Sequence, residues 1–392
     1  MMRIIQLEQI DFIGKFEIYD NCVIEVDSTI LCVSAQLTLS AYVISISVNK
    51  NQRKGKWMKK IISACVAFIL AFFVVNGIMF AYERPVAWID TPNGASRAVR
   101  NPNATLIHGT EGYSISKIDS YGFTNQNYAL ADEYILMMGA SHSQGKEITI
   151  SNRYSTIVNN MLVDDKKELR AFNIACDGHF LPSIINHFQS AIENYPKAKC
   201  VTIEIMSTDY SIDDLRNSLI LPDEIDTKTA KDIFASQSSV KRAKNMLKED
   251  LPLIAMIKNH IETSQKLNSS GGENNSINEE EYRTVITDGL SLMRSCFDGP
   301  IVFIYHPTTK IQTDGTLKLI RSQTLEIFKE ECEHVGIDFI DTGDAFLEHY
   351  NKYHELPYGF ANTTPGNGHL NEVGHKIMAD VIMDYLEEVD CK

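Results

Sequence analysis

Short, continuously apolar segments alternate with helix-like segments along most of the chain, and this alternation limits the possible folds more than any other feature. The apolar segments are residues 133–139, 169–176, 199–206, 300–306 and 337–342, and the helix-like segments include 148–164, 181–195 and 371–389. Strands of this kind are buried on both faces and pair in parallel through right-handed helical connections. The sequence therefore predicts an α/β domain, a three-layer α/β/α sandwich around a five-stranded parallel sheet, over residues 115–392.

The third and fourth predicted strands are separated by about ninety residues, which is more than one crossover needs. We interpret residues 210–298, approximately, as a helical insertion. Within it, residues 230–263 have mostly helical patterning and could cover the edge of the sheet. Residues 268–281 are rich in Gly, Asn and Ser and predict a polar loop.

An uncharged apolar run lies ahead of this domain, at residues 61–81. As a helix it spans roughly 30 Å, enough to cross the hydrocarbon core of a bilayer. Basic residues precede it at positions 50, 53, 54, 56, 59 and 60. We therefore predict a transmembrane anchor over residues 58–82, with a cytoplasmic N-terminus and an extracytoplasmic C-terminal domain. A cleaved signal peptide is the alternative, although Val75-Asn76-Gly77 matches its cleavage site poorly.

Residues 1–57 have β-like stretches and two interpretations. They could form a small cytoplasmic β unit, or they could be an upstream extension, because "MKKIISACVAF" from Met58 resembles the start of a bacterial exported protein. We favour the extension and expect little defined structure there. Residues 83–114 are assigned to a lead-in between the anchor and the domain.

Charge and cysteine content narrow the function classes. The net charge of −14 repels nucleic-acid phosphates, so nucleic-acid binding is not expected. The eight cysteines include no CxxC pair and no Cys/His spacing typical of zinc sites. Cys176 and Cys200 lie in or beside strand-like runs, which predicts buried free thiols. No metal and no cofactor are predicted.

Polar and small residues follow the predicted strands at the points where the strands end. They are Ser141, Asp177, Gly178, Asp209 and His306. The carboxyl ends of parallel strands share one edge of the sheet, where binding sites form. The stretch "ILMMGASHSQG" (135–145) ends its apolar run at Ser141, which can be a turn residue or a nucleophile.

A histidine near the C-terminus is the candidate base for this serine. His369, in "GNGHLNEVGH", stands two residues before Asn371, which is a favourable helix N-cap. The start of the helix therefore holds the histidine in one place, where it could deprotonate Ser141. We expect His142 to line the site and His375 to pack on the helix. Asp177 and Asp209 could simply cap loops.

These motifs resemble those of the SGNH (GDSL-type) hydrolases, in particular membrane-anchored bacterial envelope members. The Gly-Asp-Ser motif of that family corresponds to Gly139-Ala140-Ser141, in which the Asp is absent. Gly178 corresponds to the oxyanion glycine, and Thr208 stands at the Asn position of the Gly-x-Asn-Asp motif. In the Asp-x-x-His motif, His369 matches and Gly366 replaces the Asp.

The resemblance implies a flavodoxin-like SGNH fold and serine ester chemistry. With Gly366 in place of the Asp, the carboxylate that would orient His369 is missing or comes from elsewhere in the chain. The resemblance then implies a Ser141–His369 dyad, and an oxyanion hole of Ser141, Gly178 and Thr208. The leading hypothesis is an extracytoplasmic esterase or deacetylase acting on O-acyl groups of an envelope polysaccharide or an acylated small molecule. The alternatives are an O-acyltransferase partner in polysaccharide modification and a non-catalytic carbohydrate-binding protein.

Overall fold

The computed structural model describes residues 17–18, 22–23, 54–90, 98–126, 132–221, 225, 227–254 and 278–389. The chain divides into two units, Met1–Ile78 and Met79–Lys392, which we describe separately. Most of the predicted extension, 1–57, lies outside the described residues. In the first unit, β1 (Glu17–Ile18) pairs with β2 (Cys22–Val23) in antiparallel fashion.

The predicted anchor forms one long helix, α2 (Lys54–Tyr82). Residues Trp57–Tyr82 are apolar and long enough to cross a membrane. Large apolar side chains such as Phe68 and Val74 are each 63% exposed. A helix with little polar surface and so much exposed apolar surface matches a membrane span better than a soluble core helix.

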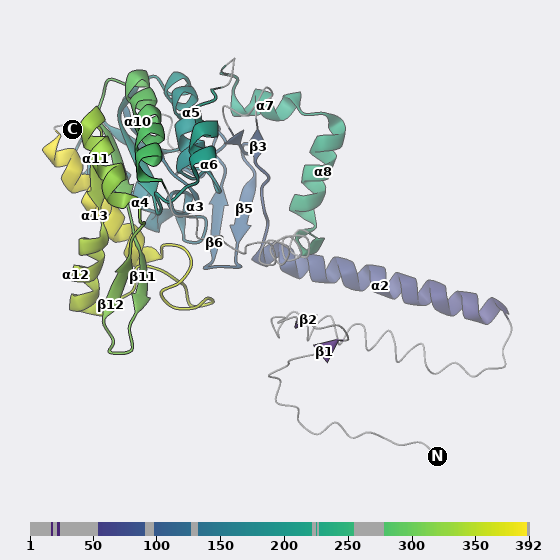
Figure 1. The fold of residues 1–392 in the computed structure, drawn as a ribbon. Helices are drawn as coiled ribbons and strands as arrows, with labels where there is room; N and C mark the ends of the chain where they lie inside the picture. The colour runs from purple at the N-terminus through teal and green to yellow at the C-terminus, as the bar shows by residue number, and fades with distance from the viewer. Residues whose placement is uncertain are drawn as a thin grey trace. The chain divides into compact units, whose positions relative to one another are not determined.

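The second unit is built on a five-stranded parallel sheet, as predicted. Figure 1 shows the helices around this sheet. Its strands are β7 (Tyr134–Met138), β8 (Arg170–Asn173), β9 (Ala198–Ile205), β10 (Ile301–Tyr305) and β13 (Asp338–Asp341). The strand order is β13-β10-β9-β7-β8, and each neighbouring pair is parallel. The direction of winding therefore changes between β7 and β9, and in open α/β sheets ligand sites form at such a change, beyond the strand carboxyl ends.

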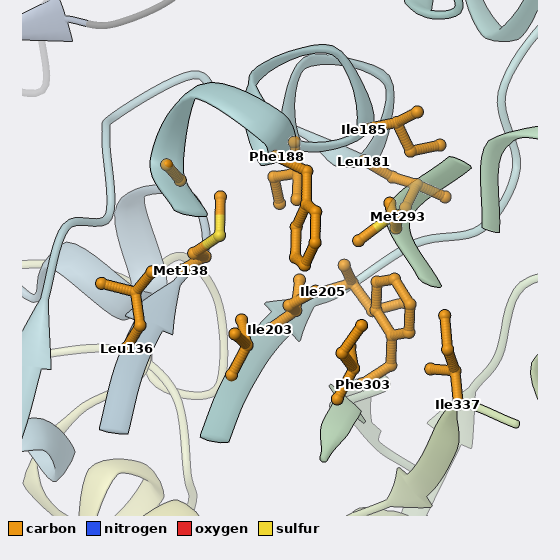
Figure 2. Packing of buried hydrophobic residues seen from close by; sticks show 14 of the residues in the cluster. Leu136, Met138, Leu181, Ile185, Phe188, Ile203, Ile205, Met293, Phe303 and Ile337 are labelled. Atoms are coloured by element: carbon orange, nitrogen blue, oxygen red, sulfur yellow. The ribbon is translucent and has the colours of Figure 1, made fainter. Parts of the chain in front are cut away.

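Helices cover both faces of this sheet. One face packs against α5 (Leu181–Asn194), α10 (Glu279–Cys296) and α11 (Leu325–Val335), with the short α6 (Ile212–Ser218) beside α5 and α10. Figure 2 shows side chains of this layer, including Leu136, Met138 and Phe188. The other face packs against α4 (Tyr154–Asp164), α12 (Gly343–Tyr353) and α13 (Glu372–Glu388).

The position of β7 between two helical layers explains why its sequence is continuously apolar. Leu136 and Met138 belong to the core of one face, whereas Ile135 and Met137 belong to the core of the other. Successive side chains on a strand point to opposite faces, so a strand covered on both sides needs apolar residues at every position. All residues of β7 are buried.

The insertion between β9 and β10 is helical where it is described. Besides α6 it contains α7 (Ala230–Ser236), α8 (Ser239–Asp250) and α10. Most of the predicted polar loop, 268–281, lies outside the described residues, and α10 begins near its end behind the N-cap Asn278. A hairpin after β10, formed by β11 (Thr308–Ile311) and β12 (Leu317–Ile320), was not expected from the sequence.

The lead-in segment also has regular structure. Strand β3 (Ile89–Asp90) pairs with β4 (Ala98–Val99), and β5 (Thr105–His108) pairs with β6 (Ser114–Lys117), both antiparallel. These strands belong to the second unit with the sheet. The β5–β6 turn therefore carries its residues into the same compact unit as Ser141.

Candidate active site

Ser141 begins a four-residue helix, α3 (Ser141–Gln144), at the carboxyl end of β7. The turn between strand and helix depends on Gly139, whose φ is +153°. A Cβ atom there would lie 2.6 Å from Glu204 Oε2 and 2.6 Å from Ser143 Cβ. Glycine at this position lets the chain turn sharply against the next strand. The turn places Ser141 at the switch point of the sheet.

His369 lies within hydrogen-bonding distance of Ser141, with 2.8 Å between His369 Nε2 and Ser141 Oγ. Its position follows from the start of α13. Asn371 caps that helix, and its side-chain oxygen accepts hydrogen bonds from the N–H groups of Val373 and Gly374 at 3.0 and 3.1 Å. Leu370, which lies between His369 and Asn371 in the sequence, is fully buried. The predicted N-cap is confirmed.

The other ring nitrogen of His369 bonds to Glu111, which lies in the β5–β6 turn. Glu111 Oε2 is 2.5 Å from His369 Nδ1, and Glu111 Oε1 accepts a hydrogen bond from the His369 backbone N–H at 2.6 Å. The expectation of a Ser–His dyad is therefore wrong. Glu111 supplies the carboxylate that Gly366 cannot, and it does so from 258 residues earlier in the sequence.

Two features hold the Glu111 turn against the His369 loop. The Asn362 side chain bonds to the turn at three points: its oxygen accepts from the Gly112 N–H, and its nitrogen donates to the carbonyls of Gly109 and Gly112. Gly368 has a φ of +95°, and a Cβ there would lie 2.2 Å from Glu111 Oε1. The glycine therefore leaves the space that the carboxylate occupies.

The charges around His369 favour its role as a base held in one tautomer. Burial lowers the pKa of His369, but the hydrogen bond to Glu111 and the charges of Glu147 and Glu111 outweigh it, so the pKa lies above the ordinary 6.5. Burial raises the pKa of Glu111, and the bonds to His369 lower it below 4.5 in net. Nδ1–H thus donates to a carboxylate, which leaves Nε2 free to accept the Ser141 proton.

A second carboxylate, Glu147, lies behind this pair. It is 1% exposed, its Oε1 is 3.6 Å from His369 Nδ1, and neither of its oxygens has a hydrogen-bond partner among the described residues. Burial raises its pKa above 4.5. Oxygen and nitrogen atoms of Glu111, Glu147 and His369 lie within 4.8 Å of one another and could hold a cation. Such an ion would compete with the hydrogen bond from His369 to Glu111.

Two backbone N–H groups are candidates for binding an oxyanion, those of Ser141 and Gly178. In the described part of the chain, neither the Ser141 nor the Gly178 N–H has an acceptor. Gly178 follows β8, has a φ of +83°, and a Cβ there would meet nothing within 4 Å. Thr208 is placed differently: it is fully buried, and its hydroxyl bonds to the Thr324 hydroxyl at 2.9 Å. We therefore leave Thr208 out of the candidate oxyanion hole.

A buried network fixes the nucleophile turn from below. Glu204, on β9, accepts hydrogen bonds through Oε2 from the N–H groups of Ala140 and Ser143, at 3.1 and 3.2 Å. Its Oε1 is 2.8 Å from His306 Nε2, and His306 Nδ1 is 2.7 Å from the Tyr358 hydroxyl. All of these side chains are nearly inaccessible. A glutamate inside the apolar segment 199–206 is the sequence signal that could have indicated it, because charged residues are rarely buried without a partner.

The hydrogen-bond partners assign the protons of this network. The Pro307 carbonyl can only accept, so the Tyr358 hydroxyl, 2.7 Å away, donates to it. His306 Nδ1 must then donate to the Tyr358 oxygen. A proton shared between His306 Nε2 and Glu204 Oε1 links these two buried side chains beneath the nucleophile. His306 was noted from the sequence only by its place after a strand.

Replacing Glu204 by alanine is expected to destabilise the protein strongly. The change leaves His306 Nε2 and two N–H groups of the nucleophile turn without their partner in the interior, and each buried polar group left unsatisfied costs about 1–3 kcal/mol. Glu204→Gln is the matched control, since its amide can accept from the turn and donate to a neutral His306. Thermal unfolding of the detergent-solubilised protein measures the difference. Equal melting temperatures for the two variants would contradict the network's role.

The other residues singled out from the sequence have structural contacts. His142 is buried, its Nδ1 accepts from the Leu370 N–H at 3.1 Å, and its ring lies 4.8 Å from that of His369, so it lines the site as expected. His375 lies in α13, is buried, and its Nδ1 accepts from the Tyr154 N–H at 3.2 Å. Asp209 accepts from the N–H groups of Gln323 and Thr324.

Asp177, beside Gly178, forms an ion pair with Lys146. Cys176 and Cys200 are buried and form no disulfide, as the sequence predicted. Asp177 therefore does more than cap a loop: its ion pair links the segment after β8 to the residues that follow α3. This contact holds the candidate oxyanion glycine close to the nucleophile turn.

No protein-family model and no curated protein matches the sequence. Solved structures with a similar fold include an alpha/beta hydrolase enzyme from the metagenome of Lake Arreo, Spain, which is 14% identical over 68% of this chain and 99% of that chain, with a TM-score of 0.35. The acetyl xylan esterase AlAXEase is 11% identical over 64% and 99%, with a TM-score of 0.35.

A third similar structure is the periplasmic domain of a lipopolysaccharide acetyltransferase from Salmonella ser. Paratyphi A. It is 10% identical over 65% of this chain and 83% of that chain, with a TM-score of 0.33. The predicted architecture, a five-stranded parallel sheet flanked by helices, is confirmed. What the chain does must be inferred from its own residues.

Proposed function

We propose that the chain is an extracytoplasmic serine esterase or deacetylase that removes O-acyl groups, with cell-envelope polysaccharide as its substrate. One observation carries this proposal: the hydrogen-bonded series Ser141–His369–Glu111 at the open edge of the sheet. A nucleophile, a base and an orienting carboxylate in this order are the parts that acyl transfer through serine requires.

The reaction would proceed through an acyl-enzyme. Ser141 Oγ attacks the carbonyl carbon of the ester while His369 Nε2 takes the hydroxyl proton. The tetrahedral intermediate then collapses, and His369 returns the proton to the departing alcohol oxygen. Water attacks the acyl-enzyme in the same way, with His369 again acting as base, and the acid is released from Ser141.

The intermediate needs hydrogen-bond donors for its oxyanion. The N–H groups of Ser141 and Gly178 are assigned this role, because both are left without acceptors beside the nucleophile. Each such donor is worth about 2.7–4 kcal/mol in the barrier of acyl-transfer enzymes. Glu204 supports them indirectly, since it holds the turn that aims the Ser141 N–H.

Labelling with a fluorophosphonate probe tests the nucleophile directly. The full-length protein should be labelled at Ser141 and should release acetate from an O-acetylated glycan. Transfer of the acyl group to an added oligosaccharide, in place of its release, would make the chain an acyltransferase. Absence of both labelling and acyl chemistry would leave the carbohydrate-binding alternative.

The location is proposed from α2 and the charges around it. The basic residues before the apolar run support an orientation with the N-terminus inside and the second unit outside. Residues 1–57 would then be an upstream extension, 58–82 the anchor, and the remainder the catalytic part. Glu111 assigns residues 83–114 to that catalytic part, since it belongs to the site.

Protease added to intact cells is expected to digest the second unit, because the domain would lie outside the cytoplasmic membrane. An antibody against a C-terminal tag follows the loss of the full-length band. A cytoplasmic protein of the same cells serves as the control for lysis. A domain that resists digestion until the cells are broken would reverse the proposed orientation.

A further inference from the structure

Helix α8 presents its apolar side chains to solvent, away from the domain to which it is attached. Val240 is 80% exposed, and Met246 and Leu247 are 57% and 55% exposed. Val240 and Leu247 lie on one face of the helix, seven residues apart, with Ala243 between them. The opposite face carries Glu249, which is 9% exposed. A surface helix of a soluble domain normally has the reverse arrangement.

The C-terminal turn of α8 is fixed to the residues that follow α2. Glu249 Oε1 accepts a hydrogen bond from the Ala87 N–H at 3.2 Å, and Asp250 pairs with Arg84 at 3.7 Å. Arg84 in turn bonds through its backbone to Ile107, at the end of β5. Contacts with the compact unit therefore hold the C-terminal end of α8 in place.

These contacts set how far α8 can lie from the end of the apolar helix. Tyr82 is the last residue of α2, and Ala87 follows five residues later. An extended chain advances at most about 3.6 Å per residue, so Ala87 lies within roughly 20 Å of that end. The headgroup layer of a bilayer crossed by α2 would begin at the same point. A helix attached there is within reach of the membrane surface.

The charges next to the apolar face suit an anionic surface. Lys241 and Lys244 are exposed on the flank of the face that carries Val240 and Leu247. Lysine can keep its stem along apolar groups and place its ammonium among phosphates. An outward apolar face with lysines at its border is typical of helices that lie in the interfacial layer.

We propose that α8 lies on the bilayer surface, with Val240 and Leu247 in the headgroup region and Lys241 and Lys244 on anionic lipid. Helix α8 is then a second membrane contact besides α2. This contact holds the domain at one tilt and sets the height of the active-site edge above the bilayer. The proposal rests on α2 crossing the membrane, as in the proposed function, and it is independent of which side the domain faces.

Depth-dependent quenching in vesicles tests this contact. The full-length protein receives an environment-sensitive fluorescent amino acid at Leu247 or, as a matched control, at Ile320, which is 48% exposed on β12. Each protein is reconstituted into phosphatidylcholine vesicles with or without phosphatidylglycerol, and lipids brominated near the headgroup serve as quenchers. We expect strong quenching at Leu247 in the anionic vesicles and little at Ile320.

Two sets of variants separate the contributions. Val240→Glu should abolish quenching at position 247. Lys241→Glu with Lys244→Glu should reduce the population in which α8 lies on the bilayer, measured as quenching at position 247, by more than about tenfold, since each lysine near an anionic surface contributes roughly fivefold. Both sets should leave ester turnover in detergent unchanged, which shows that the domain is folded.

The outcomes distinguish the possible failures. Extraction of the protein by alkaline carbonate would show that α2 does not span the bilayer, which overturns the premise that α2 anchors the protein. An inserted protein with no more quenching at Leu247 than at Ile320 overturns the proposal for α8. Equal quenching in vesicles without phosphatidylglycerol overturns the role of the two lysines. The fluorescence could instead change with the density of protein in the vesicles and not with brominated lipid. This result would assign the apolar face of α8 to a contact with a second protein copy and overturn the membrane contact.

Discussion

Ser141→Ala is expected to abolish turnover of a short-chain aryl ester, with a fall in kcat of at least about a thousandfold. The substitution removes the only atom that could form the acyl-enzyme and leaves the base without a proton to accept. The serine side chain lies at the edge of the sheet and is 9% exposed, so its hydroxyl contributes little to folding. Initial rates of chromophore release measure the effect, and the melting temperature serves as the control for folding.

The nucleophile and the base should act as one unit. His369→Ala is expected to lower kcat by a similar factor, and the double variant should be hardly slower than either single variant, because such losses do not add. Ser141→Ala with wild-type rates would show that another residue is the nucleophile. Additive losses would show that the 2.8 Å contact between Ser141 and His369 has no part in the reaction.

Glu111→Gln is expected to lower kcat by about ten-thousandfold, the loss observed when the carboxylate of a serine triad becomes an amide. Glu111 accepts two hydrogen bonds from His369, from its backbone N–H and from Nδ1–H. A glutamine has one oxygen for both. If the oxygen serves the backbone, the amide nitrogen faces Nδ1 and selects the tautomer whose Nε2 cannot accept the Ser141 proton.

The pH profile tells this effect from a purely structural one. The base must be neutral, so kcat/KM falls as pH drops through the pKa of His369, which lies above 6.5 in the wild type because of Glu111 and Glu147. Glu111→Gln removes a hydrogen bond and a charge that favour the imidazolium. The acidic limb of its residual activity should therefore move to lower pH, and Glu111→Asp should retain the wild-type limb.

The predicted loss of activity in Glu111→Gln would fail if Glu147 replaced Glu111 as the carboxylate that orients His369. The Glu147 carboxylate is 3.6 Å from His369 Nδ1 and could take over the orienting role. If Glu111→Gln keeps kcat within about tenfold of the wild type, the same measurement on Glu147→Gln identifies the carboxylate that matters. Gly366→Asp is not expected to restore activity, since residue 366 has a φ of +75°, which strains any residue other than glycine.

The sheet could be predicted from the sequence because it depends on local patterns. Each predicted strand end lies one residue from the observed one, except the end of the second strand, which lies three residues away. The segment Tyr134–Met138 is apolar throughout because helices cover both faces of the sheet. The start of α13 was found from Asn371, whose capping bonds reach only two and three residues along the chain. The boundaries of the domain were harder to place, since paired strands such as β5 and β6 are only four residues long.

Part of the candidate site could be predicted for the same reason. Ser141 and His369 each lie next to an element whose end is visible in the sequence, the end of β7 and the start of α13. Thr208 was placed in the site by its match to the Asn position of the Gly-x-Asn-Asp motif, yet its hydroxyl bonds to Thr324. A residue's place after a strand fixes its level in the sheet, but packing around it decides where the side chain points.

The sequence by itself therefore determined the layers of the domain, the apolar helix ahead of it and two residues of the candidate site, because propensity, periodicity and capping act over a few residues. Only the tertiary structure identified the carboxylates of the site, Glu111 and Glu204. Glu111 meets His369 across 258 positions through the Asn362 contacts, and Glu204 reaches the nucleophile turn from a neighbouring strand. Asp and Glu are common in any sequence, and no local sequence pattern distinguishes a carboxylate that will be buried against a histidine. That choice is made by the packing of the β5–β6 turn and β9 around the site, where an unpaired charge would be too costly to bury.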